Sequence, residues 1–126
     1  KFIESAVLGK DLEINGDGSQ TRTFCFIEDN LKATIESMEK DFWINDVINI
    51  GNDNEISIIE LANTVIRTLN SKSSIKFVKP LAEGDMTRRK PDISKMKSFF
   101  TGSFTSLKEG IMLTHEGLIR NKSNSL

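Results

Sequence analysis

One helical pattern of apolar residues stands out along the chain, between residues 57 and 69. Its apolar residues recur every three or four positions, so they would share one face of a helix. Ser57 and Glu60 have the spacing of a capping box, which marks the start of a helix. The pattern predicts an amphipathic helix whose core-facing residues are Ile58, Leu61, Ala62, Val65, Ile66 and Leu69.

Shorter apolar stretches predict the strands. Runs that are rich in β-branched or aromatic residues, or that alternate with polar ones, lie at 12–15, 22–27, 46–50 and 75–78. Glycine and asparagine tolerate positive φ, so "NGDG" at 15–18 predicts a tight turn. We therefore expect the first two strands to form a β-hairpin.

Local signals also predict the other helices. Residues 2–8 resemble the end of a helix that stops at Gly9. Asp29 is the expected cap of a helix that runs to about Lys40. A short helix is expected at 93–100, and a longer one, opened by a capping box at Ser106 and Glu109, from Leu107 to about Arg120. Residues 79–92 are expected to form a polar loop.

The order of these elements indicates a mixed α+β module. The strands are few and short, and the chain lacks a long series of strand–helix–strand units, so a complete doubly wound domain is excluded. A chain of 126 residues is one domain or a piece of one. The sequence begins at Lys1, inside an expected helix, and we expect it to be a fragment.

Composition narrows the function classes. A net charge of −1 gives no basis for a nucleic-acid partner or a polybasic membrane anchor. The apolar runs are far too short to span a membrane. The single cysteine permits no internal disulfide and fits a reducing compartment, so a cytoplasmic location is expected. The chain contains no tyrosine, which excludes any mechanism that uses a tyrosine of its own.

Neither a metal site nor a catalytic residue is expected. An EF-hand loop that starts at Asp11 would place Arg22 where the bidentate glutamate must stand. With one cysteine and one histidine, a zinc site is equally unsupported. His115 is expected to be a packed residue on a helix face, and Cys25 a buried small apolar residue.

Arginine is the residue type by which this chain could bind phosphate. The "GDG" at 16–18 lacks the spacing and helix start of a dinucleotide-binding loop. Guanidinium groups stay charged and bind phosphate oxygens in pairs, which makes Arg22, Arg88 and Arg89 the candidates. The alternative for each is a solvated surface charge.

Four motifs in this order carry a resemblance to a known family. They are "GDGSQTR", "NIGN", "RRKPDISK" and "LKEG". The sequence resembles the second half of extended short-chain dehydrogenase/reductase (SDR) enzymes that modify nucleotide sugars, over residues 2 to about 115. It is most similar to UDP-glucuronate decarboxylases, with UDP-glucose 4-epimerases and dTDP-glucose 4,6-dehydratases as relatives.

The resemblance implies that NAD and the nucleotide sugar are bound by different parts of a longer enzyme. The family's N-terminal half is a Rossmann domain that binds NAD and carries a Tyr-x-x-x-Lys couple, and this chain lacks that NAD-binding half. Residues 1–121 would be the C-terminal nucleotide-sugar-binding part and 122–126 a tail. NAD would then belong to the parent enzyme, with none bound by this chain alone. The expected partners are a UDP-sugar or related nucleotide sugar, the Rossmann half, and in a homodimer a second copy.

The family's binding roles can be carried over by position. Arg22 of "GSQTR" matches an arginine that reaches the nucleotide sugar. Arg88 and Arg89 match loop arginines that meet the diphosphate and, in decarboxylases, the sugar end. Ile14 and Asn15 match a strand that lines the base and ribose. Phe26 stands where the family usually has tyrosine, and "GSFT" at 102–105 replaces "GW-x-P". A stand-alone, non-catalytic binding module and a structural remnant without a ligand are the other hypotheses.

Overall fold

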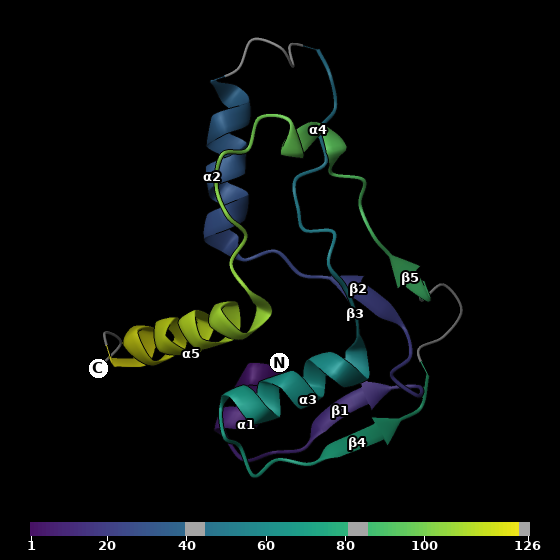
Figure 1. Cartoon of the computed structure of the whole chain (residues 1–126). Helices are drawn as coiled ribbons and strands as arrows, with labels where there is room; N and C mark the ends of the chain where they lie inside the picture. The colour runs from purple at the N-terminus through teal and green to yellow at the C-terminus, as the bar shows by residue number, and fades with distance from the viewer. Residues whose placement is uncertain (40–44, 81–85, 124–126) are drawn as a thin grey trace.

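A computed structural model describes residues 1–39, 45–80 and 86–123, and it places helices and short strands in two connected regions (Figure 1). Side chains are described up to residue 120. In chain order the elements are α1 (Phe2–Val7), β1 (Leu12–Asn15), β2 (Thr21–Thr23), α2 (Ile27–Met38), β3 (Glu55–Ser57), α3 (Ile58–Thr68), β4 (Ile75–Val78), β5 (Arg88–Arg89), α4 (Ser94–Lys97) and α5 (Leu107–Ser123).

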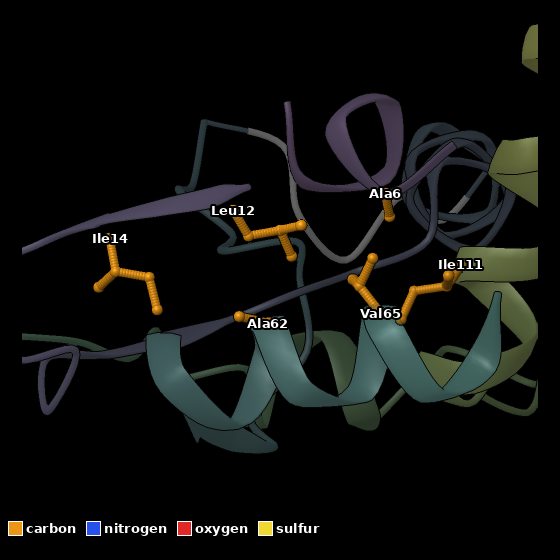
Figure 2. Packing of buried hydrophobic residues seen from close by; sticks show 6 residues of the cluster. All are labelled: Ala6, Leu12, Ile14, Ala62, Val65 and Ile111. Carbon is orange, nitrogen blue, oxygen red and sulfur yellow. The ribbon is translucent and has the colours of Figure 1, made fainter. Parts of the chain in front are cut away.

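The main core lies between a two-stranded parallel sheet and three helices. Strands β1 and β4 pair in parallel, with Leu12 opposite Ile75. The side chains of Leu12 and Ile14 point toward the buried face of α3, and α1 and α5 close the end of the cluster (Figure 2). The buried members are Ala6, Leu12, Ile14, Ala62, Val65 and Ile111, and we call them the main core.

A smaller cluster lies between α2, α4 and the segment that precedes the last helix. Its buried members are Ala33, Ile93, Met96 and Phe99, and we call it the second cluster. Polar contacts tie the segment 45–54 to α4 and to the residues just before that helix. The Lys95 ammonium lies 2.7 Å from a carboxylate oxygen of Asp46, and the Asn49 amide donates to the Asp92 carbonyl at 3.0 Å.

The third structural unit is a small sheet that connects these regions, with the strand order β3–β2–β5 (Figure 1). Strand β2 pairs antiparallel with β3 and parallel with β5. Because β3 continues directly into α3, the sheet is attached to the main core.

Helices α3 and α5 begin where the sequence signals predict. Helix α3 begins after Ser57, whose hydroxyl accepts from the Glu60 backbone N–H at 3.2 Å, and it buries its predicted face. Helix α5 begins at Leu107, and the Ser106 hydroxyl accepts from the Glu109 N–H. The strand predicted at 75–78 is confirmed as β4.

The predicted hairpin is wrong. Gly16 and Gly18 do turn the chain, with φ of +71° and +77°, but the turn leads away from β1. The backbone N–H groups of Ile58 and Ile59 donate to the carbonyls of Gln20 and Gly18, so the segment after the turn bonds to the start of α3. Strand β1 instead pairs with β4, and β2 lies in the other sheet.

Other boundaries differ from the predictions as well. Strand β2 ends at Thr23, because Ile27 already opens α2. Asp29 is not the cap of that helix but a buried residue of its first turn. Residues 46–50 form no strand, and no strand in the described part of the chain pairs with them. The predicted end of α2 at Lys40 lies outside the described residues.

No helix in the described ranges has the combination of length and apolar character that crossing a bilayer demands.

Candidate nucleotide-sugar site

The register of the β3–β2–β5 sheet sorts the candidate arginines onto two faces. Arg22 on β2 lies directly opposite Arg89 on β5, and Thr21 lies opposite Arg88. Directly opposed residues point to the same side of a sheet, and successive residues point to opposite sides. Arg22 and Arg89 therefore share one face, and Arg88 lies on the other.

Arg88 forms an ion pair with a carboxylate on the same face of the sheet. Its Nε and Nη2 donate to the two carboxylate oxygens of Glu55, at 2.8 and 2.9 Å. The Thr21 hydroxyl donates to the same carboxylate. The bidentate arginine, followed by the threonine, lowers the pKa of Glu55 from 4.5 to about 2, so this carboxylate is ionised at neutral pH.

Arg22 lies on the opposite face, at the wall of a cavity. Its Nη1 donates to the Thr21 carbonyl at 2.8 Å, which holds the guanidinium close to the strand. The cavity measures about 720 Å³, within the usual size of small-molecule sites. Its apolar lining comes from α1, α3, α5 and the link between β2 and α2, namely Phe2, Ile3, Phe24, Phe26, Ile58, Leu61, Val65, Leu107, Ile111 and Leu118.

The two predicted strand residues have different environments. Ile14 is 1% exposed, and its side chain packs in the main core (Figure 2). Asn15 is half-buried at the end of β1, and its carbonyl accepts from the Gln20 side-chain amide at 2.9 Å. The structure therefore gives Ile14 a packing position and leaves Asn15 at the edge of the turn.

Sequence reasoning missed Glu55 and Thr21. Glu55 lies in β3, a strand absent from the sequence predictions, although the β-branched run that follows Glu55 could have indicated it. The ion pair itself joins residues 33 positions apart, and no local pattern reports such a contact.

Cys25 and His115 remain poor candidates for chemistry. Cys25 is half-buried rather than buried, and desolvation, followed by the charge of Asp29, raises the pKa of its thiol. A raised pKa disfavours the reactive thiolate. His115 lies on α5 as predicted. The described residues contain no group of three His, Cys, Asp or Glu side chains able to hold a metal ion.

The turn at 16–18 does not form a dinucleotide cradle. Such a cradle places glycines between a strand and a helix N-terminus, which then faces the phosphates. Here the turn connects β1 to β2, a strand of another sheet. The geometry of this turn therefore does not fit NAD.

Sequence comparisons identify the relatives of this chain. A model described as "NAD dependent epimerase/dehydratase family" matches residues 1–51. UDP-glucuronic acid decarboxylase 3 of Arabidopsis thaliana is 39% identical over 118 residues, which cover 91% of this chain and 33% of that protein. UDP-N-acetyl-alpha-D-glucosaminuronate decarboxylase of Bacillus cytotoxicus is 39% identical over 103 residues, 77% of this chain and 32% of that protein.

Solved structures show the same relationship. UDP-glucuronic acid 4-epimerase from Bacillus cereus, in complex with UDP-glucuronic acid and NAD, superposes with a TM-score of 0.80 at 30% identity. That match covers 91% of this chain and 37% of the epimerase. UDP-glucose 4-epimerase from Thermotoga maritima, with UDP-glucose, gives 0.83 at 26% identity and covers 95% and 38%.

The fold is thus that of Rossmann-type SDR epimerases and dehydratases, in a mixed α+β portion of it. The chain is similar to members of the NAD-dependent epimerase/dehydratase family and corresponds to a C-terminal portion of such enzymes. It spans about a third of the length of the curated relatives that it matches.

Proposed function

We propose that this chain is the substrate-binding portion of an NAD-dependent nucleotide-sugar-modifying enzyme, most like UDP-glucuronate decarboxylase. The observation that carries the proposal is the pairing of Arg22 with Arg89 across β2 and β5. Two guanidinium groups on one face of a sheet suit the oxygens of a diphosphate, which accept paired charge-assisted hydrogen bonds.

The proposed reaction converts UDP-glucuronate to UDP-xylose. The conversion releases carbon dioxide, and NAD bound by the rest of the enzyme would supply reversible hydride transfer at the sugar. Within this chain the proposed task is to bind and orient the nucleotide sugar. The decarboxylases among the relatives, at up to 39% identity, support this reaction.

The described contacts divide the candidate residues into two groups. Arg22 and Arg89 would bind the diphosphate, and Asn15, at the end of β1, would face the nucleoside side of the ligand. Arg88 and Ile14 would not contact the ligand. Arg88 would stabilise the site through its ion pair with Glu55, and Ile14 through its packing in the main core.

A binding experiment on the chain itself tests the proposal. Calorimetry with UDP, UDP-glucuronate and dTDP should show weak binding of the uridine ligands. Arg22→Ala should abolish the signal, and Arg89→Ala should reduce it about tenfold or more, since a hydrogen bond to a charged group contributes about 1.5–3 kcal/mol. Arg67→Ala, an exposed arginine on α3, is the matched control and should leave the affinity unchanged. Equal signals from the wild type and all three variants would refute the proposal.

A 4-epimerase is the second candidate activity. The similarity to UDP-sugar epimerases of known structure, with TM-scores of 0.80 and 0.83, favours it. Ligand preference separates a UDP-glucose epimerase from the enzymes of acidic sugars, which include both the decarboxylases and the UDP-glucuronic acid 4-epimerase. Tighter binding of UDP-glucuronate than of UDP-glucose by the chain supports an acidic-sugar enzyme, and the reverse order supports a UDP-glucose epimerase.

A further inference from the structure

A single carboxylate connects all three strands of the β3–β2–β5 sheet. Glu55 lies on the outer strand β3, and its bidentate partner Arg88 lies on the other outer strand, β5. The hydroxyl of Thr21, on the central strand β2, donates to the same carboxylate. We call these three residues the Glu55 clamp.

The clamp and the paired arginines occupy opposite faces of the sheet. Thr21 and Arg88 are directly opposed, as are Arg22 and Arg89 one residue further along. Because adjacent residues of a strand point to opposite sides, a contact that fixes Thr21 against Arg88 also fixes the register of Arg22 against Arg89.

Backbone pairing alone gives this register little support. Strand β5 has two residues and β2 has three. The Thr21 N–H donates to the Thr87 carbonyl at 2.9 Å, at the edge of the pair. A ladder this short depends on side-chain contacts to hold its register.

We propose that Glu55 is a positioning residue, which through Arg88 and Thr21 holds Arg89 beside Arg22 for binding a nucleoside diphosphate. The inference deepens the proposed function and rests on it. It also separates the two neighbouring arginines: Arg89 contacts the ligand, and Arg88 acts through Glu55 and does not.

The ionisation of Glu55 supports this role. Because the pKa of its carboxyl is lowered to about 2, Glu55 stays negatively charged over the whole pH range in which binding is measured. Glu55→Gln therefore removes a charge that is present in the wild type and keeps the shape of the side chain.

The sign of the Glu55→Gln effect separates the two possible roles of Arg88. If Arg88 contacted the diphosphate directly, Glu55 would compete for its guanidinium, and Glu55→Gln would strengthen binding. If Glu55 positions Arg89 through Arg88, the same substitution weakens binding. The double variant Glu55→Gln/Arg88→Gln adds a second criterion. When two residues act as one unit, the losses of binding free energy caused by the two single substitutions do not add in the double variant.

The experiment measures UDP affinity by calorimetry for the wild type, Glu55→Gln, Arg88→Gln and the double variant. We expect each single variant to bind about three- to tenfold more weakly, and the double variant to be no weaker than either. Glu55→Asp should recover part of the loss. Glu13→Gln, which alters an exposed ion pair with Lys76, is the matched control and should bind as the wild type does. Unchanged or tighter binding by Glu55→Gln overturns the inference, and so do additive losses.

Amide hydrogen exchange, measured without ligand, separates failure of this inference from failure of the proposed function. The Thr21 N–H reports on the β2–β5 pair, and Glu55→Gln should speed its exchange while thermal melting shows an intact fold. If the wild type does not bind UDP but Thr21 exchange accelerates, the proposed function fails and the positioning of Arg89 stands. If the exchange rate of the Thr21 N–H is unchanged, the positioning role is overturned, whatever the UDP affinity of the variants.

Discussion

Helices α3 and α2 are both amphipathic, but only α3 buries its apolar face. Val65 in α3 is 1% exposed and lies against the β1–β4 sheet and α5. Leu31 in α2 is 56% exposed. It belongs to a stripe of exposed apolar residues at helical spacing, namely Ile27, Leu31, Ile35 and Met38. We call this set the α2 stripe.

The two helices are held in place by different forces. Helix α3 is one layer of the main core (Figure 2). Helix α2 buries Ala33 in the second cluster and is otherwise fixed by polar contacts along the segment that leads to α5 (Figure 1). Asp29 accepts from the backbone and hydroxyl of Thr105, and Glu36 accepts from those of Thr101. Amphipathic spacing therefore identifies the apolar face of a helix, but it does not show which part of the protein, if any, packs on that face.

The largest expected effect comes from truncating the main core. Leu12→Ala should lower the free energy of unfolding by about 2–5 kcal/mol, because Leu12 is fully buried and its removal leaves a cavity. Leu31→Ala, the same substitution in the α2 stripe, should cost no more than about 0.5 kcal/mol. Denaturant unfolding monitored by circular dichroism measures both. Equal losses would show that the two regions do not differ.

A smaller loss is expected from the polar contacts of α2. Asp29→Ala should destabilise the protein by about 1–3 kcal/mol, because it leaves the Thr105 N–H and hydroxyl without the acceptor they have now. Asp29→Asn keeps one side-chain oxygen and should lose less. Thermal melting checks the order, and a variant Asp29→Ala as stable as the wild type would show that packing alone holds α2.

The α2 stripe should also drive self-association. Exposed apolar patches of contiguous residues associate in water, so the chain should form concentration-dependent oligomers. Leu31→Glu should weaken this association, whereas Leu8→Glu, at a comparably exposed leucine just after α1, should not. Sedimentation velocity over a range of concentrations distinguishes the two variants. A strictly monomeric wild type at high concentration would contradict the prediction.

The smallest effect concerns the sheet between the regions and its dependence on pH. The pKa of Glu55 is lowered in the folded chain to about 2, so its stabilisation is present above its ordinary pKa of 4.5 and is lost as the pH falls toward 2. The melting-temperature difference between the wild type and Glu55→Gln should thus be constant above about pH 5 and shrink below it. A melting-temperature difference that grows as the pH falls would contradict the stabilising role of the ionised Glu55 carboxylate.

Local signals in the sequence were sufficient for most of the helices. The caps at Ser57 and Ser106 and the periodicity of α3 involve residues within a few positions of one another, and the structure confirms them. The fold class and the resemblance to the family were likewise identified correctly from short motifs.

Strand pairing could not be predicted in the same way. The sequence indicated a turn at 15–18, but whether β1 then pairs with β2 depends on β4, whose residues lie about sixty positions away. For the same reason the arginines at 22, 88 and 89 could be named as candidates but not sorted. Only the register of β2 against β5 shows that Arg89, and not Arg88, shares a face with Arg22.

The most direct test of the account is a titration of the chain with UDP, followed through the arginine Nε–Hε signals in NMR spectra. The signals can be assigned with single Arg→Lys variants. We expect the signals of Arg22 and Arg89 to shift together with one dissociation constant, while that of Arg88 keeps the position set by its ion pair with Glu55. A shift of Arg88 with no change at Arg22 and Arg89 would contradict it.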